Sequence, residues 1–328
     1  MDKAFHAVLV CVAAMTPLAV SAATAAPETD YPRQAIRIVV PYAAGGMTDI
    51  VARVVGQKLG ERLGQPVVVE NRPGAATIVG AELVAGARPD GYTLLAATNT
   101  TLTINPWLYP SLRYDPVKSF APIAMVASAP SVIVVNPQLP AKTLADLVQL
   151  ARTKPGSVSY ASYGNGSTAH LAGEMLKARA GVELLHVPYK GSAPAKAAVM
   201  ANEVSVTFEP AFTGMPQISA GKLRALAVMS SKRSAVMPDV PTTAELGYAG
   251  MEMAAWVGFM TPRGTPPGIV SKLAGEIERI VNEPDVRRTL LQSGAEPAGY
   301  YGEAFAAYMR DENARYGRVI TASHIRAD

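Results

Sequence analysis

The sequence contains a single cysteine among its 328 residues, Cys11. This cysteine lies in an N-terminal stretch in which Lys3 precedes an apolar run at 7–20, and small residues follow at 20–26. That order is typical of a secretory signal peptide, so we predict that residues 1–26 are cleaved and that the mature chain is exported. The predicted mature chain then has no cysteine, which excludes disulfides, thiolate nucleophiles and cysteine metal ligands.

Charged residues are also scarce, at 17% of the chain, with 30 Lys and Arg against 26 Asp and Glu. The basic residues are scattered and do not alternate with aromatic ones, so we expect no nucleic-acid partner. After residue 26 no apolar run reaches 18 residues, so we expect no membrane-spanning helix. Hydrophobic residues, in contrast, make up 49% of the chain, enough for buried cores, and the length is typical of two domains.

Short β-branched runs alternate with amphipathic stretches along the mature chain, a pattern that predicts an α/β fold. The runs are apolar almost throughout, so we expect mainly parallel sheets that are flanked by helices on both faces. The predicted strands cover residues 36–40, 67–70, 93–97, 132–135, 158–161, 184–187, 204–208, 223–229 and 255–260.

Helices are predicted between these strands from the 3.6-residue periodicity of apolar positions and from capping signals. Thr143 and Asp146 form a capping box, and Thr242 with Glu245 has the same spacing. The predicted helices cover residues 49–63, 143–153, 167–180, 267–281 and 303–315, with a short one after Thr242.

Two extended stretches, 127–136 and 251–261, have the character of crossings between two parts of the molecule. If the chain leaves one lobe at the first and returns at the second, lobe I comprises residues 27–128 plus 250–328, and lobe II comprises residues 129–249. Ligands of open α/β sheets bind beyond the carboxyl ends of the strands. Two such lobes would therefore enclose a ligand cleft that closes by a hinge motion.

A first glycine-rich loop, residues 41–49, follows a predicted strand and opens a helix. Gly45 and Gly46 allow the backbone to approach a ligand closely, and the free N–H groups of the helix would bind an anion. The equally supported alternative is an ordinary turn, with Thr48 as the N-cap and Asp49 favouring the helix dipole.

A second glycine-rich loop, residues 163–170, spells G-x-G-x-x-A, with Glu183 at 19 residues beyond Gly164. This spacing matches a dinucleotide-binding fingerprint, but export separates the chain from the cytoplasmic nicotinamide pool, and we expect no cofactor. A small-anion site is the favoured interpretation, because Ser167 and Thr168 add hydroxyl donors that suit a carboxylate. A plain turn is the remaining alternative.

Catalytic motifs are missing from the sequence. It contains no G-x-S-x-G elbow, H-E-x-x-H pair or phosphate-binding P-loop. His170 falls in the first turn of a predicted helix, where packing or capping is the favoured role. Asp49 and Glu209 could form a carboxylate pair in an exported hydrolase, but nothing in the sequence sets their separation, and that function is unsupported. We therefore expect a protein that is not an enzyme and holds no metal.

A series of motifs extends in order over about residues 31–262. Together they resemble the Bug-type periplasmic receptors of tripartite tricarboxylate transporters. The motifs are YP at 31–32, IVVPYAAGG at 38–46 with Asp49, VENRPG at 69–74, PDGYTL at 89–94, NPWLY at 105–109, YDP at 114–116, YGNGSTAH at 163–170, HVPYKG at 186–191, GKLRALA at 221–227 and PDVPT at 238–242.

The resemblance implies a two-lobed periplasmic-binding-protein-like fold of type II that closes on a small carboxylate: an organic acid, an aromatic acid or an amino acid. Both glycine-rich loops would hold the carboxylate through backbone N–H groups, hydroxyls and bridging waters, and Tyr189 and Glu209 would set specificity. The implied ligand contacts are Tyr42, Ala44, Gly45, Gly46, Thr48, Asp49, Thr98, Asn99, Gly166, Ser167, Thr168, His170, Tyr189 and Glu209.

One position departs from the pattern that the resemblance implies, since aspartate is usual there and this chain has Glu209. The longer side chain would push the carboxylate farther into the cleft and favour a ligand that also carries an amine or a hydroxyl. The resemblance further implies a periplasmic monomer, with the permease subunits of a membrane transporter as possible partners. The alternatives are a sensory receptor that presents its liganded form to a signalling protein and, with less support, a secreted enzyme.

Overall fold

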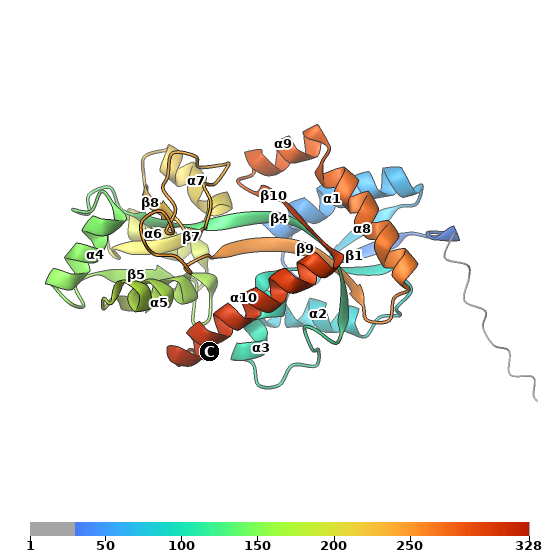
Figure 1. Cartoon of the computed structure of the whole chain (residues 1–328), viewed down its shortest axis with the longest axis horizontal. Helices are drawn as coiled ribbons and strands as arrows, with labels where there is room; N and C mark the ends of the chain where they lie inside the picture. The colour runs from blue at the N-terminus through green and yellow to red at the C-terminus, as the bar shows by residue number, and fades with distance from the viewer. Residues whose placement is uncertain (1–29, 328) are drawn as a thin grey trace, which may run out of the picture.

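The structure is a computed structural model that describes residues 30–327 and has a mixed α/β architecture (Figure 1). The predicted signal peptide lies outside the described residues. The strands are β1 (Ile36–Val40), β2 (Val67–Asn71), β3 (Thr93–Ala97), β4 (Phe120–Val135), β5 (Ser159–Ser162), β6 (Leu185–Pro188), β7 (Val206–Pro210), β8 (Arg224–Val228), β9 (Ala254–Pro262) and β10 (Glu296–Tyr301).

Helices cover both ends of the sheet. They are α1 (Met47–Leu63), α2 (Ile78–Ala85), α3 (Asn105–Leu108), α4 (Leu144–Thr153), α5 (Thr168–Ala180), α6 (Ser192–Met200), α7 (Ala211–Ser219), α8 (Pro267–Val281), α9 (Pro284–Gln292) and α10 (Gly302–Ala322), with a 3₁₀ turn η2 (Ala75–Thr77) and a π-helix η3 (Thr100–Ile104). Within residues 30–327 none of these helices combines the length and the apolar character needed to cross a bilayer.

The strands follow the order β2-β1-β3-β9-β4-β7-β5-β6, with β8 and β10 also paired to β4. The expected parallel pairing is found at both ends, among β1, β2 and β3 and among β5, β6 and β7. A mainly parallel sheet describes these outer strands only, because β4 and β9 are antiparallel to their neighbours. The apolar runs indicated burial on both faces, and helices provide that burial whatever the strand direction.

The long strands β4 and β9 connect two lobes (Figure 1). The first part of β4 pairs with β9 and β10, and its last residues pair with β7 and β8. We call the part built on β1, β2, β3 and β10 the β1 lobe, and the part built on β5 to β8 the β5 lobe. Each lobe has its own hydrophobic cores.

The C-terminal helix α10 contributes to the cores of both lobes. Phe305, near its start, is fully buried in a core of the β1 lobe. Tyr316 and Ile320, farther along, are buried in the main core of the β5 lobe, together with Ile104 from η3. The helix begins close to the predicted position but extends seven residues past the predicted end at 315.

Capping chemistry explains where several predicted elements begin and end. The Thr143–Asp146 capping box is formed at the start of α4. Thr242 and Glu245 exchange the same pair of hydrogen bonds, at 2.8 and 3.0 Å, but no helix follows, because Gly247 with a φ of 88° ends the turn. The first half of β4, together with β10, α2, α6, α7 and α9, was not predicted.

Candidate functional site

The first glycine-rich loop connects β1 to the 17-residue helix α1. Gly46, not Thr48, is the N-cap, so the interpretation of Thr48 as the cap is wrong by two residues. Gly45 has a φ of 89°, which favours glycine, and the space above Gly45 and Gly46 is open to 4 Å. No side chain caps the first N–H groups of α1, so they are left for another acceptor.

Asp49 fixes the conformation of this loop through hydrogen bonds. Its carboxylate accepts hydrogen bonds from the Gly45 N–H at 2.9 Å, from Asn71 Nδ2 at 2.9 Å and from Arg53 Nε at 3.1 Å. Burial raises the pKa of Asp49, but the hydrogen bonds from Arg53, Gly45 and Asn71 outweigh it, and the pKa lies below its ordinary value. Asn71 also donates to the Tyr42 carbonyl at 3.1 Å, which ties β2 to the loop.

The end of β3 lies beside this first loop. The Tyr42 hydroxyl is 3.0 Å from Thr98 Oγ1, and burial raises the pKa of Tyr42. Asn99 is buried and donates to the Ala254 carbonyl of β9 at 2.9 Å. Thr98 and Asn99 directly precede the π-helix η3, a rare conformation that often occurs at functional sites.

The second glycine-rich loop connects β5 to α5 and has a true side-chain cap. Ser167 Oγ accepts from the His170 N–H at 3.4 Å and from the Tyr163 N–H at 3.2 Å. The Gly166 N–H donates to His170 Nδ1 at 3.1 Å. Gly166 has a φ of 73°, and a Cβ there would lie 2.4 Å from the Cδ1 of Leu108. Glycine is therefore required by the backbone and by the neighbouring α3.

His170 is packed rather than placed for catalysis. Its ring is 9% exposed and stacks on His186 with a centroid distance of 3.9 Å. His186 in turn stacks on Tyr160 at 4.8 Å and lies 2.6 Å from the Ser162 hydroxyl. The three stacked rings pack against the second loop, in agreement with the packing role favoured for His170.

Glu209, at the end of β7, is fully buried. Its Oε2 accepts from the Thr213 hydroxyl at 2.7 Å and the Ser192 hydroxyl at 3.1 Å, and lies 3.8 Å from Lys196 Nζ. Among the described residues its Oε1 has no hydrogen-bond partner. The nearby Tyr163 hydroxyl donates its proton to the Phe208 carbonyl at 2.6 Å. Burial raises the pKa of Glu209, and the hydrogen bond from Thr213 and the charge of Lys196 offset part of that effect.

The predicted contact residues thus form two groups. One contains the first loop and the end of β3, and the other contains the second loop and Glu209, joined through Tyr163. Leu108 of α3 lies against Gly166, which brings the β1 lobe into contact with the second loop. Ala44 and Gly45 are exposed, and Tyr189 is half-buried against a core of the β5 lobe.

Sequence reasoning missed Glu312, a fully buried carboxylate on α10. It accepts hydrogen bonds from Thr103 of η3 and Trp256 of β9, both at 2.8 Å, and from Tyr316 at 3.0 Å. Burial raises its pKa. The only signal in the sequence is a tyrosine four residues to either side, Tyr308 and Tyr316, on the same helix face. No three His, Cys, Asp or Glu side chains in the described chain are grouped to hold a metal ion.

Comparisons with known proteins show which family the chain resembles in sequence. Residues 51–325 match the family model described as the tripartite tricarboxylate transporter family receptor. The chain is 36% identical to the protein BugT of Bordetella pertussis over 291 residues, which cover 88% of this chain and 89% of BugT.

Two similar solved structures contain a bound acid. One is Rpa4515 of R. palustris with adipate, with a TM-score of 0.79 and 34% identity, covering 91% of this chain and all of that chain. The other is MatC of Rhodopseudomonas palustris with bound malate, with a TM-score of 0.74 and 32% identity, covering 88% of this chain and all of that chain.

Proposed function

Because the chain belongs to the tripartite tricarboxylate transporter receptor family, we propose that it is a periplasmic receptor that captures a small carboxylate between its lobes. Its two-lobed α/β fold is that of the periplasmic binding proteins. The observation that carries the proposal is the pair of glycine-rich loops, each of which opens a helix with backbone N–H groups at its start. Adipate and malate in two similar structures support a carboxylate ligand.

The first loop supplies N–H groups without a net positive side chain. Asp49 is neutralised by Arg53 and holds Gly45, so the anion is bound by the backbone at the N-terminus of α1. The open space above Gly45 and Gly46 leaves room for a carboxylate. Thr98 would be a further contact, because its Oγ1 lies 3.0 Å from the hydroxyl of Tyr42 in the same loop.

Ser167 supplies a hydroxyl donor in the second loop. A serine oxygen accepts two hydrogen bonds and donates one. The N–H groups of Tyr163 and His170 take both acceptor positions, so the proton of Ser167 is directed toward an acceptor such as a carboxylate oxygen. Thr168, half-buried beside it, adds a second hydroxyl.

Glu209 narrows the class of ligand. A buried carboxylate with one unpartnered oxygen is costly unless a donor approaches it. We assign this donor to the ligand, as a hydroxyl or an ammonium group in addition to its carboxylate. A hydroxy acid or an amino acid therefore fits better than a plain dicarboxylate.

Binding would proceed by closure of two lobes, residues 27–128 plus 250–328 and residues 129–249, about the crossing strands β4 and β9. Closure excludes water and strengthens the hydrogen bonds to the ligand. The monomeric closed form would then be recognised by permease subunits of a membrane transporter, and no bond of the ligand would be broken.

Thermal shift of the ligand-stripped mature chain against small carboxylates and amino acids tests the receptor proposal. A ligand at 100 times its Kd adds about 2.7 kcal/mol of stability. For a chain of this length that raises Tm by about 5 °C or more. Intact ligand should be recovered afterwards, and a chemically altered ligand would contradict the assignment as a receptor.

The Glu209→Gln variant tests the ligand class, with malate and succinate as a pair that differs by one hydroxyl. We expect Kd for malate to rise about tenfold or more and Kd for succinate to change less than about threefold. Glu183→Gln, which changes the same charge at an exposed position, is the matched control. Equal losses for malate and succinate would contradict the role given to Glu209.

A further inference from the structure

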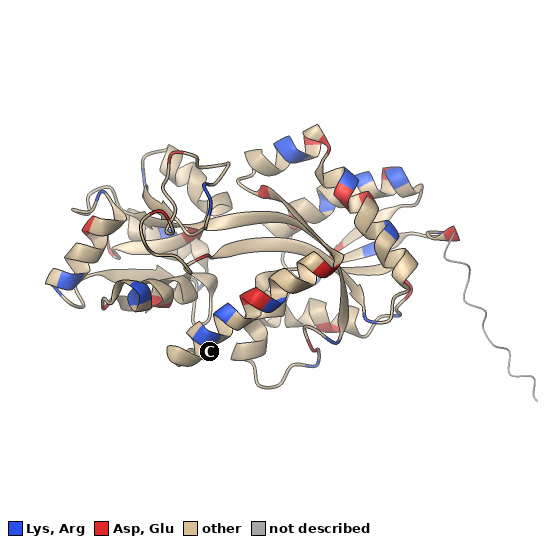
Figure 2. Ribbon diagram, viewed as in Figure 1, with Lys and Arg blue, Asp and Glu red and all other residues tan. Residues whose placement is uncertain are grey.

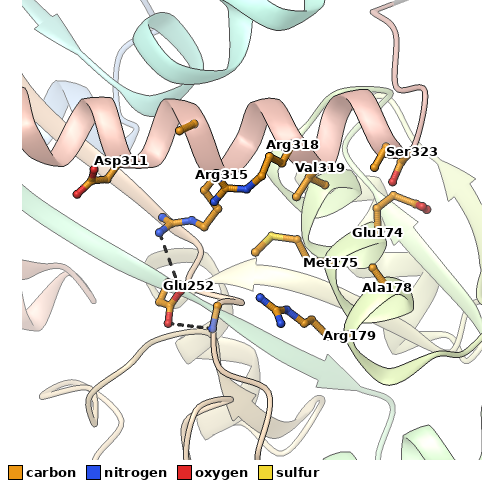
Figure 3. A pocket seen from close by; sticks show the side chains of 13 residues that line it. Glu174, Met175, Ala178, Arg179, Glu252, Asp311, Arg315, Arg318, Val319 and Ser323 are labelled. Atoms are coloured by element: carbon orange, nitrogen blue, oxygen red, sulfur yellow. Dashed lines mark hydrogen bonds and ion pairs between the residues drawn. The ribbon is translucent and has the colours of Figure 1, made fainter.

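A cavity of about 580 Å³ opens between α5, α10 and the segment just before β9 (Figure 3). Its polar lining includes Arg179 of α5, Arg315 and Arg318 of α10, and Glu252. None of the residues predicted to contact a ligand in the cleft lines this cavity. Its volume is in the range of sites that hold small molecules. It is therefore a space separate from the cleft.

Three guanidinium groups at this cavity lack strong partners within the protein. Among residues 30–327, Arg179 and Arg318 form no ion pair with any acid. Arg315 lies 3.9 Å from Glu252 and 4.0 Å from Glu312, which are long ion-pair distances. Its Nε is buried and has no hydrogen-bond partner in the described chain. Its guanidinium also lies 5.5 Å from the centroid of the Tyr316 ring, so Arg179 and Arg318 are the two arginines of this cavity without a partner in the described chain.

Three acids also line the cavity, Glu174, Glu252 and Asp311, and none of them forms an ion pair with Arg179 or Arg318. Glu174 already accepts from Lys177 Nζ at 3.1 Å and from the Tyr160 hydroxyl at 2.9 Å. Glu252 accepts from the Gly250 N–H at 3.3 Å in addition to its long pair with Arg315. Asp311 is exposed. These acids are thus exposed or bonded elsewhere, and the guanidinium groups of Arg179 and Arg318 remain without an ion pair in the described chain.

The backbone makes room for one of the arginines. A Cβ at Gly250 would lie 2.4 Å from Nη2 of Arg179, so glycine allows the guanidinium to lie over this segment. Along most of the ribbon, positions of Lys and Arg are interspersed with positions of Asp and Glu (Figure 2). The three arginines at this cavity are instead brought together from two helices by the fold (Figure 3).

We propose that this cavity is a second binding site, for a small oxyanion with two or more negative charges. Arg179 and Arg318 would hold it by paired N–H donors, a geometry that guanidinium groups offer to phosphate and carboxylate alike. Arg315 also lines the cavity, beside Glu252. Phosphate and polycarboxylates share this chemistry.

Calorimetric titration of the ligand-stripped mature chain with inorganic phosphate and, separately, with citrate tests the proposal at constant ionic strength. The test variant is Arg179→Gln with Arg318→Gln, both at exposed positions where folding should be retained. The matched control is Lys222→Gln with Arg288→Gln, which removes the same charge elsewhere. We expect the test variant to raise Kd about tenfold or more and the control to change it less than about twofold.

Binding of phosphate alone identifies a phosphate site, and binding of citrate alone identifies a polycarboxylate site. Each result supports the proposal if the measured Kd depends on Arg179 and Arg318. A Ser167→Ala variant should leave this binding unchanged, which separates it from binding in the cleft. Arg179→Lys with Arg318→Lys, which keeps the charge but loses the paired donors, should have an intermediate Kd. Binding of neither anion, or equal Kd in the test and control variants, would overturn the proposal.

Discussion

The two glycine-rich loops share one hydrogen-bond pattern, but different side chains form it. In each, the N–H of a glycine is bound by a side chain four residues later in the first turn of the following helix. The Gly45 N–H donates to Asp49 Oδ2 at 2.9 Å, and the Gly166 N–H donates to His170 Nδ1 at 3.1 Å. A side chain thus fixes each loop, and the remaining N–H groups at the helix start stay available for a ligand.

The surroundings of the two loops differ. The first is held by a charged acceptor that is fixed by Asn71 and Arg53, and it faces open space. The second is held by an imidazole, capped by Ser167 and covered by Leu108. One loop therefore depends mainly on electrostatics and the other mainly on packing, and substitutions should separate the two contributions.

Asp49→Ala should cause the largest loss of stability. It removes a buried carboxylate and leaves the Gly45 N–H and Asn71 without their acceptor, at a cost of about 3 kcal/mol. Arg53→Ala, which removes a half-exposed partner of the same carboxylate, should cost less than about 1 kcal/mol. Urea unfolding of both variants measures the difference, and similar losses would show that Asp49 acts only through its ion pair.

Gly166→Ala should cost about 2 kcal/mol, because a positive φ and the contact with Leu108 both oppose a methyl group. Gly45→Ala has the positive φ but open space, and should cost about 1 kcal/mol. In a Leu108→Ala background the cost of Gly166→Ala should fall to that of Gly45→Ala. A cost that is unchanged in that background would exclude packing as the source of the difference between the loops.

Ser167→Ala should cost about 1 kcal/mol through loss of the N-cap. Thr48 does not cap α1, and valine has the same shape as threonine. Thr48→Val should therefore change the free energy of unfolding by less than about 0.5 kcal/mol. Chemical unfolding compares the two variants, and a larger loss for Thr48→Val would restore Thr48 as the cap of α1.

The charged loop should also respond to acid. Because the folded pKa of Asp49 lies below its ordinary value of 3.8, its stabilising effect is complete above pH 3.8 and is lost as pH falls through the folded pKa. The stability gap between the wild type and Asp49→Asn should therefore narrow as pH falls below 3.8. Urea midpoints at pH 7 and pH 3 measure it, with Asp239→Asn on an exposed turn as the control. A constant gap would contradict the role of the charge.

Both loops could be located from the sequence because glycine pairs and hydroxyl residues after apolar runs are local signals. Ser167 was predicted as the first residue of a helix and is the N-cap of α5, whereas the interpretation of Thr48 as a cap was wrong because Gly46 caps α1 through its backbone alone. The bonds from Gly45 to Asp49 and from Gly166 to His170 could not be predicted, since G-x-x-x-D and G-x-x-x-H occur in many turns. Their geometry appears only when the loop is folded.

Features that depend on distant segments were the least predictable. β4 and β9 are antiparallel because each strand leads into a different lobe. An apolar run in the sequence does not indicate whether its strand pairs parallel or antiparallel. The surroundings of Glu209 combine Ser192, Lys196 and Thr213 from two other helices, so the burial of this carboxylate could not be read from its neighbours in sequence.

The placement of α10 in the cores of both lobes has a mechanical consequence. The strands β4 and β9 lie side by side and define one axis. Two lobes that were joined only by these strands could still rotate about that axis. A helix embedded in both bodies is a third tie away from that axis, and it removes much of this remaining degree of freedom. The proposed closure would then have to bend α10 or slide it against one core, and the hydrogen bonds of Glu312 to both η3 and β9 would oppose such a change in the section between Phe305 and Tyr316.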